Sequence, residues 1–355
     1  MCLYTKMIKN PKYKPTKKNG GKPPFCSDAR LEYIPAECGE CPECRKKKQR
    51  EWVIRLCEEL KESFGYFITL TIDENYLRKI QEQTGLPLPG NENEIAKYAM
   101  RHFLERVRKN TGKSLRHWAV TELGEDKGRI HLHTVMFGQR AAELTKKHWK
   151  YGNIFMGNYT NERTIRYITK YMLKFDEKHP LFKGEVLSSK GLGLGYINRE
   201  GKRVNKYREE KTNELYRFRN GKVAELPTIY RNHIYSEEER EKLWLQKLDK
   251  GEIWVHGEKF NIPKITDINS DEEAEEVKAE LKKIEETTEY YRRTLCSIQH
   301  DNEEAWEKRA KHRKLMKQQR RAVMNLAKES RGCARWILIN GKYRVIDIAT
   351  GEIIK

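Results

Sequence analysis

The sequence contains no apolar run that approaches the roughly 18 residues needed to span a membrane. Its opening residues, MCLYTKMIKN, also lack the apolar stretch of a secretory signal peptide. These two absences argue against a membrane-embedded or secreted protein, so we expect a protein of a reducing cytoplasm. The eight cysteines are therefore expected to be thiols or metal ligands rather than disulfides.

Hydrophobic residues are scarce, and acidic residues are outnumbered by basic ones. Only 37% of the 355 residues are hydrophobic and 35% are charged, so we expect a modest core and long solvated helices. Lysine and arginine number 72 against 52 aspartates and glutamates, which gives a formal net charge of +20. Such a charge repels itself unless a polyanion is bound. Nucleic acid is the first expectation and an acidic membrane surface the second.

A nucleotide-driven motor is not expected either. NTGKS at 110–114 resembles the end of a phosphate-binding loop, but Val107 stands where that loop needs its first glycine. GLGLG at 191–195 lacks the context of a dinucleotide-binding motif and favours a hairpin or loop. Contact of this glycine-rich stretch with a DNA backbone is the lesser alternative. Any unwinding of DNA would therefore depend on another protein.

The pattern from 61 to 180 predicts alternating strands and helices. Strands are expected at 65–73, 114–123 and 130–138, and helices at 94–110 and 161–175. The order strand, helix, strand, tight turn, strand, helix is not that of a doubly wound parallel sheet. It predicts an α+β domain, in which helices pack on one face of an antiparallel sheet.

The flanking segments are more polar. Residues 1–60 predict a basic arm and a cysteine cluster leading into a helix, and residues 181–265 an extension of hairpins and helices. Residues 266–335 predict charged helices, whose basic part either grips phosphates or forms a solvated face. Residues 336–355 predict a β-hairpin, because Asn340-Gly341 fits a type I′ turn.

Two histidines share one face of the strand predicted at 130–138. Side chains alternate along a strand, so His131 and His133 point the same way, about 7 Å apart. The turn in TELGEDKGR brings Glu122 back toward them, with Glu125 and Asp126 as nearby alternatives. A carboxylate and two imidazoles suit Mg²⁺ or Mn²⁺ and leave positions open for a phosphate. The other interpretation is a pair of ordinary core or surface histidines.

The helix predicted at 161–175 has a second chemical pattern. Tyr167 and Tyr171 lie about 40° apart on an ideal helix, flanked by Lys170 and Lys174. A tyrosinate can attack a phosphodiester, and an ammonium can offset charge on its oxygens or lower a phenol pKa. Two such tyrosines can act in turn, one holding a DNA end while the other cuts. An ordinary amphipathic helix surface is the alternative.

Several of these segments resemble a known superfamily. HLH at 131–133, YITKYMLK at 167–174 and FITLTID at 67–73 resemble motifs of the HUH endonucleases, in particular the rolling-circle replication initiators. MCLYTKMIKNPKY, CGECPECRKKKQREW, RHWAVTELG and IYSEEEREKLWLQKLDK resemble more specifically the replication initiation proteins of gokushoviruses, single-stranded DNA phages of the Microviridae. This closer resemblance covers most of residues 1–250.

The resemblance implies an RRM-like antiparallel sheet with a metal site on its central strands. It implies a metal-dependent, site-specific single-strand DNA endonuclease and strand transferase. Such an enzyme nicks the origin, leaves a 5′-phosphotyrosine and a free 3′-OH, and later rejoins the strand into a circle. The implied partners are single-stranded and origin DNA, a host helicase and a host DNA polymerase in the host bacterial cytoplasm.

The residue match assigns the roles. Tyr167 and Tyr171 would be the nucleophiles, and Lys170, which lies between them, the better auxiliary lysine. The implied metal ligands are His131, His133 and Glu122.

Three cysteines form a second candidate metal site. Cys38, Cys41 and Cys44 give the spacing C-x₂-C-x₂-C, for which zinc is the default ion in a reducing compartment. Zinc takes four ligands, and Cys26 or Cys57 can complete the set. Packed buried thiols and redox or iron–sulfur chemistry are the alternatives.

Two further groups are candidate contacts to DNA. The basic residues after the cysteines either meet phosphates or form a solvated helix start: Arg45, Lys46, Lys47 and Lys48. Aromatic residues that can stack on unpaired bases, if they are not core, are Tyr66, Trp118 and Tyr151.

Two other functions fit part of the sequence. A non-catalytic, zinc-stabilised nucleic-acid-binding protein accounts for the charge and the cysteines but gives the histidine pair and the two tyrosines no role. A plasmid relaxase or transposase of the same superfamily keeps the chemistry, and only the phage-like N-terminal segment argues against it. A covalent DNA adduct on Tyr167 or Tyr171 separates the enzyme from the binding protein.

Overall fold

The computed structural model describes residues 2–86, 88–124, 128–174, 178–179, 182–262, 271–296, 334–339 and 342–347. The described residues fall into two compact units. One is drawn from Met1–Glu59 and Gly193–Gln299, the other from Leu60–Leu192 and His300–Lys355. The first unit therefore combines two segments that lie far apart in the sequence.

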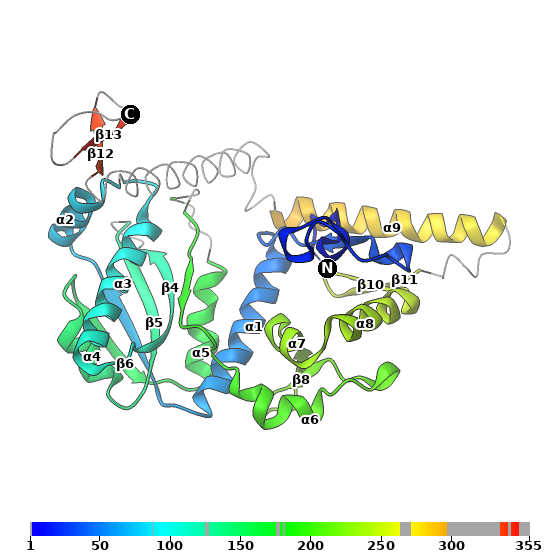
Figure 1. The fold of residues 1–355 in the computed structure, drawn as a ribbon, viewed down its shortest axis with the longest axis horizontal. Helices are drawn as coiled ribbons and strands as arrows, with labels where there is room; N and C mark the ends of the chain where they lie inside the picture. The colour runs from blue at the N-terminus through cyan, green and yellow to red at the C-terminus, as the bar shows by residue number, and fades with distance from the viewer. Residues whose placement is uncertain are drawn as a thin grey trace. The chain divides into compact units, whose positions relative to one another are not determined.

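The second unit is built on a five-stranded antiparallel sheet with the strand order β6-β3-β5-β4-β7 (Figure 1). Its strands are β3 (Gly65–Thr71), β4 (Arg116–Leu123), β5 (Ile130–Phe137), β6 (Ile154–Tyr159) and β7 (Val186–Ser188). The three central strands are those predicted from the sequence, and the α+β class is confirmed. The edge strands β6 and β7 were not foreseen.

Helices α3 (Glu92–Thr111) and α4 (Ala141–His148) cover one face of this sheet, and α2 (Glu74–Thr84) packs beside α3 (Figure 1). The core under them comes from alternate strand residues, such as Leu70 and Leu132, and from Phe103 of α3, all fully buried. Each such side chain stabilises the fold by about 1.5–3 kcal/mol. Alternation along β5 places His131 and His133 on the opposite face.

That opposite face receives α5 (Glu162–Ile168) and the 3₁₀ helix Thr169–Met172 that continues it. The contact is fixed by Ile165 and Ile168, which are fully buried as the helical pattern predicts. The predicted helix over 161–175 is therefore present through residue 172, but its last turn is tighter than an α-helix.

The first unit is mostly helical. Its elements are β1 (Lys6–Lys9) paired with β2 (Tyr33–Ala36), α1 (Pro42–Leu60), α6 (Lys202–Val204), β8 (Leu215–Arg217), β9 (Val223–Glu225), α7 (Thr228–Ile234), α8 (Glu237–Lys250), β10 (Glu252–Val255), β11 (Glu258–Asn261) and α9 (Asp271–Cys296). The hairpin expected from YRFRNGKVAELP is confirmed as β8–β9. The helix expected in this region is confirmed as α8.

The hairpin suggested by SSKGLGLGYINREGKRV is wrong. A π-helical turn over Ile197–Gly201 leads into α6 instead. A Cβ at Gly193 would lie 2.3 Å from the carbonyl oxygen of Arg55. Glycine is needed there because the chain passes directly over α1, not because it reverses direction.

The C-terminal hairpin is confirmed. β12 (Ala334–Ile339) pairs with β13 (Lys342–Asp347), with Ile339 opposite Lys342. The predicted turn residues Asn340 and Gly341 lie outside the described residues, as does the basic stretch at 306–331. In the part of the chain that is described, no helix combines the length and apolarity needed to cross a membrane.

Candidate active site

The predicted histidine pair and its acidic neighbour lie together on the sheet face opposite α3 and α4. β4 and β5 pair with Glu122 opposite His131. Oε2 of Glu122 lies 2.5 Å from Nε2 of His133. The two strands thus bring the carboxylate to the imidazoles as the sequence suggested. The alternatives Glu125 and Asp126 lie outside the described residues.

His133 is oriented by neighbours on three sides. The hydroxyl of Thr69 lies 3.2 Å from Nδ1 of His133. The ring of Tyr171 stacks on the imidazole, with centroids 3.9 Å apart and planes inclined by 9°. Phe67 is also nearly parallel, with its centroid at 6.2 Å. Because Nδ1 is engaged by Thr69, Nε2 is the nitrogen that faces Glu122.

His131 is positioned by a close approach of the backbone. A Cβ at Gly124 would lie 2.6 Å from Cε1 of His131, so glycine is needed to leave room for the ring. Burial lowers the pKa of His131, although a hydrogen bond with the backbone of Arg129 opposes this effect. The imidazole is therefore neutral near pH 7, the form that coordinates a metal ion.

The two tyrosines meet at their hydroxyls. The Oη atoms of Tyr167 and Tyr171 lie 2.8 Å apart, and their rings are nearly perpendicular, at 87°. Tyr167 is 51% exposed, whereas Tyr171 is half-buried against His133. A phosphate that reaches one phenol is therefore within reach of the other and of the histidine face.

Lys174, rather than Lys170, reaches this cluster. Nζ of Lys174 lies 2.5 Å from Oε1 of Glu122. Burial of Glu122 raises its pKa, but the hydrogen bonds from His133 and Lys174 outweigh that effect and hold the pKa below its usual value. Lys170 is exposed, and no ion pair joins it to another described residue. The preference for Lys170 as the auxiliary lysine stays a prediction, and the geometry favours Lys174.

By its chemistry, the set of His131, His133 and Glu122 fits a divalent ion. Two imidazole nitrogens and a carboxylate from adjacent strands are suitable ligands for Mn²⁺ or Mg²⁺. Glu122 is hydrogen-bonded to both His133 and Lys174, so binding an ion requires it to exchange those partners. Among the described residues, the group whose His, Cys, Asp or Glu ligand atoms all lie within 4.8 Å of one another is a cysteine cluster.

That cluster has a fourth member that the sequence did not reveal. The three predicted cysteines, Cys38, Cys41 and Cys44, gather around Cys2. The prediction that Cys26 or Cys57 completes the set is wrong, because neither belongs to this group. Local spacing identified three ligands, but the fourth arrives from a distant part of the chain.

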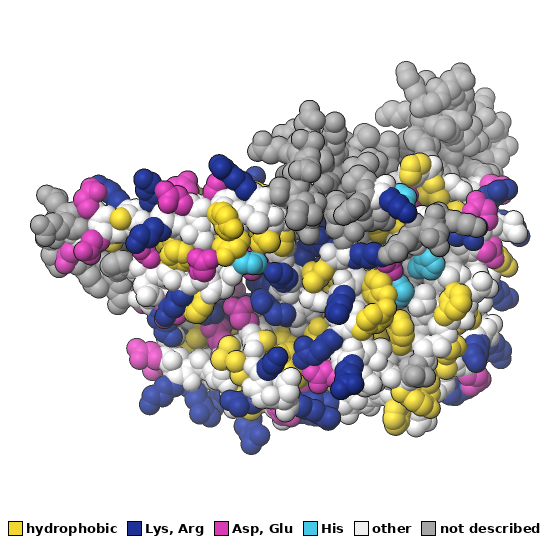
Figure 2. Space-filling model, turned by 180° about the vertical axis from the view of Figure 1, so that it is seen from behind, with side chains coloured by type: hydrophobic (Ala, Val, Ile, Leu, Met, Phe, Trp, Pro, Cys, Tyr) yellow, Lys and Arg dark blue, Asp and Glu magenta, His cyan; other side chains and the backbone are white. Residues whose placement is uncertain are grey.

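The basic residues that follow the cysteines lie in the first turns of α1. Lys46 and Lys48 are exposed, Arg45 is half-buried, and Nζ of Lys47 lies 2.6 Å from a carboxylate oxygen of Glu37. Figure 2 shows lysine and arginine side chains spread widely over the surface that it presents, in keeping with the net charge of +20. Phosphate contact by Arg45 to Lys48 stays a prediction.

The aromatic candidates for base stacking are largely core. Trp118 is fully buried and Tyr151 is 8% exposed, so the prediction that they stack on bases is wrong. Tyr66 is half-buried and packs against Tyr159, with ring centroids 5.2 Å apart. Phe155, which the sequence did not single out, is 59% exposed on β6.

Phe155 belongs to the same face as the histidines. It lies opposite Thr69 in the β3–β6 ladder, and Thr69 lies opposite His133 in the β3–β5 ladder. Paired residues of neighbouring strands point to the same side of a sheet. Phe155, Thr69 and His133 therefore form a row across three strands that ends at an exposed aromatic ring.

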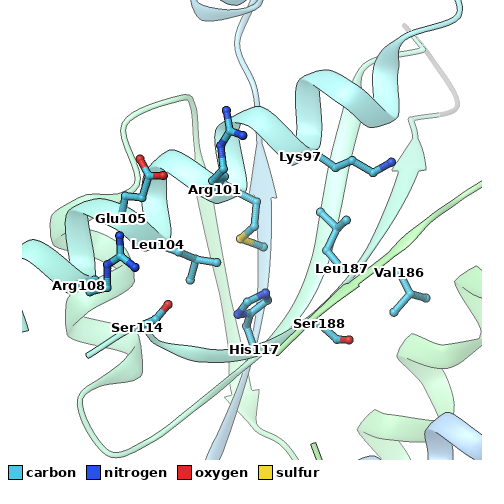
Figure 3. A pocket seen from close by; sticks show the side chains of 11 residues that line it. Lys97, Arg101, Leu104, Glu105, Arg108, Ser114, His117, Val186, Leu187 and Ser188 are labelled. Carbon is cyan, nitrogen blue, oxygen red and sulfur yellow. The ribbon is translucent and has the colours of Figure 1, made fainter. Parts of the chain in front are cut away.

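A pocket of about 530 Å³ lies on the other face of the sheet, between α3 and β7 (Figure 3). Its lining includes the basic side chains of Lys97, Arg101 and Arg108, together with His117 and Ser188. Burial lowers the pKa of His117, which therefore stays neutral near pH 7. None of the candidate catalytic residues lines this pocket, so the predicted chemistry belongs to the opposite face.

Comparison with known proteins gives two matches. Residues 65–176 match a family model of replication-associated proteins, that of the ORF2 type. The replication-associated protein ORF4 of Chlamydia phage 1 is 22% identical over 198 residues, which cover 46% of this chain and 46% of the relative. The chain thus spans about half the length of the curated relative that it matches. No solved structure matches. The matched family region contains all the candidate tyrosines, histidines and lysines, together with Glu122.

Proposed function

We propose that this chain, a Microviridae-type replication initiation protein by its two matches, nicks one strand of a phage origin through a tyrosine and later rejoins it as a circle. The observation that supports this most directly is the meeting of the Tyr167 and Tyr171 hydroxyls beside His133. The curated relative is a phage protein, which favours a phage initiator over a plasmid relaxase or a transposase.

The proposed first step is a transesterification at phosphorus. A phenol oxygen bonds to the phosphorus, the bond from phosphorus to the 3′ oxygen breaks, and the phenol proton balances the proton gained by that oxygen. The products are a 5′-phosphotyrosine and a free 3′-OH, which a host polymerase can extend after a host helicase opens the duplex. One phosphoester replaces another, so the step needs no ATP.

The residues around the phenols have supporting roles in this proposal. The 2.8 Å hydrogen bond between the tyrosines gives an attacking phenol an adjacent oxygen that can accept its proton. The ammonium of Lys174 is available to offset phosphate charge once Glu122 turns to an ion. A divalent ion held by His131, His133 and Glu122 would supply polarisation of the scissile phosphate.

The second tyrosine accounts for closure of the circle. After replication, the free phenol can cut the regenerated origin, and the new 3′-OH attacks the first phosphotyrosine. Both phenols share one place on the sheet, so the bound DNA end does not have to move to a different site. This arrangement is what a single-tyrosine nuclease would lack.

The direct test is covalent capture. The full chain is incubated with labelled single-stranded origin oligonucleotides and Mn²⁺, resolved on a denaturing gel, and any DNA-linked peptide is mapped by mass spectrometry. An adduct on Tyr167 or Tyr171 that requires the metal supports the proposal. Tight binding without any adduct or cut, across several origin fragments, would instead favour a non-catalytic nucleic-acid-binding protein.

Phe155 is expected to stack on an unpaired base next to the scissile phosphate. Replacing Phe155 with alanine should weaken binding of single-stranded DNA by about tenfold, because base stacking on an aromatic ring contributes about 1–3 kcal/mol. Fluorescence anisotropy measures this change. The matched control is Phe64→Ala, which removes a ring that is 62% exposed but precedes β3. Equal effects of the two variants would contradict a specific role for Phe155.

Gly124 is expected to tolerate a methyl group only by displacing His131. In Gly124→Ala the new Cβ would approach Cε1 of His131 to 2.6 Å, so the ring must turn away. The Mn²⁺ concentration that half-activates nicking should rise about 10–100-fold, while the melting temperature changes little. A titration of activity against Mn²⁺ at saturating DNA measures this effect, and an unchanged titration would show that His131 is not held by this contact.

A further inference from the structure

We infer that Cys2, Cys38, Cys41 and Cys44 form a closed, structural zinc site in the first unit. The Sγ atoms of Cys38 and Cys44 lie 3.9 Å apart, as do those of Cys2 and Cys41. Zinc–sulfur bonds of about 2.3 Å place the sulfurs of a regular tetrahedron about 3.8 Å apart. Disulfides would need about 2.05 Å. The observed spacing therefore encloses one ion and leaves no space for the inorganic sulfides of an iron–sulfur cluster.

Backbone amides donate to the sulfurs that the ion would share. The amides of Tyr4 and Cys38 lie 3.4 and 3.3 Å from Sγ of Cys2. Those of Glu40 and Cys41 lie 3.4 and 3.2 Å from Sγ of Cys38. Four thiolates and one Zn²⁺ retain two negative charges, and amide donors are the groups that stabilise such charge inside a protein.

The start of α1 adds to this stabilisation. The amide of Arg45 donates to the carbonyl of Cys41 at 3.0 Å, so Cys41 stands at the N-terminal end of the helix and Cys44 lies in its first turn. The positive end of the helix dipole thus faces the thiolates. Gly39, at φ +74°, makes the tight turn that lets Cys38 and Cys41 meet.

The site is enclosed on all sides by apolar neighbours. Cys41 is fully buried and Cys2 and Cys44 are 6% exposed, in a cluster that contains Leu3 and Val255. Four protein ligands in such surroundings leave no open position for water or substrate. These are the properties of a structural rather than a catalytic zinc site.

The ion would join segments that are distant in sequence. Cys2 stands 36 residues before Cys38, and the β1–β2 ladder, which pairs Lys6 with Ala36, returns the chain to that point. Nε of Arg292 in α9 donates to the carbonyl of Leu3 at 2.7 Å. Binding of zinc should therefore order the β1–β2 pair, the start of α1 and α9 together.

Metal analysis of the full chain tests this inference independently of nicking. Protein purified without added metal should hold about one zinc per chain. After exchange, Co²⁺ should give the intense thiolate-to-metal charge-transfer bands and visible bands of a tetrahedral site. Iron in place of zinc, or paired disulfides seen as mass losses, would overturn it.

Two cysteine variants make the test specific. Cys2→Ser should lose the zinc and the cobalt charge-transfer bands, whereas Cys26→Ser should keep both, because Cys26 lies outside the cluster. If Cys2→Ser does not fold, chelation of the wild type still decides the matter. Removal of the ion should abolish hydrogen-exchange protection in residues 2–44 and α9 and leave the sheet of the second unit protected. Unchanged protection throughout would overturn a structural role.

Discussion

Replacement of both Tyr167 and Tyr171 by phenylalanine should lower origin nicking by about 10⁴-fold or more and abolish the covalent DNA adduct. The two substitutions remove the only oxygens proposed to attack phosphorus. Phenylalanine keeps the ring that stacks on His133 at 3.9 Å, so the histidine should stay in place. Binding of single-stranded DNA should therefore stay within about twofold of the wild type. Adduct yield on denaturing gels and anisotropy measure the two quantities separately.

The single variants and a control refine this result. With one phenol left, nicking should continue at a reduced rate, but closure of the circle should fail because it needs two transfers. Tyr159→Phe is the matched control, since Tyr159 is 66% exposed in the same unit and is not part of the tyrosine pair. An adduct that persists in the double variant would disprove the assignment of these two nucleophiles.

Loss of either histidine should have the second largest effect. His131→Ala or His133→Ala removes a ligand of the proposed divalent ion and should reduce nicking by about 10³-fold. DNA binding in the presence of EDTA should not change, because both states then lack the ion. His102→Ala is the control, as His102 lies on α3 and pairs with Glu105 at 3.1 Å.

The metal dependence distinguishes a ligand from a structural histidine. In the wild type, EDTA should stop nicking and added Mn²⁺ should restore it. In His133→Ala, high Mn²⁺ should recover part of the activity, because His131 and Glu122 still offer two ligands. If nicking by the variants matches the wild type at every Mn²⁺ concentration, the histidines are not ligands and this face of the sheet has another role.

Much of the second unit follows from local pattern. Alternation in IHLHTVMF predicts that His131 and His133 share a face, and the β4–β5 ladder places them there. The buried Ile165 and Ile168 likewise follow from helical spacing. In both cases a regular element fixes the side-chain directions, so the sequence is sufficient.

The sequence could not reveal features that depend on tertiary contacts. The strand β6 was missed because Gly157 interrupts its alternation, and with it the exposed Phe155 on the histidine face. Trp118 looked like a stacking residue, but it is fully buried. Cys2 could not be assigned from spacing, because it joins the other cysteines only through the β1–β2 ladder.

The two faces of β5 answer to different selective pressures. Leu132 and Met136 are fully buried under the helices, so their side chains are constrained by volume. His131 and His133 point the other way and are constrained by what they bind. A mutation on one face need not disturb the other, so the preferred metal or origin can diverge between relatives while the fold remains the same. This separation allows one scaffold to serve initiators that recognise different origins.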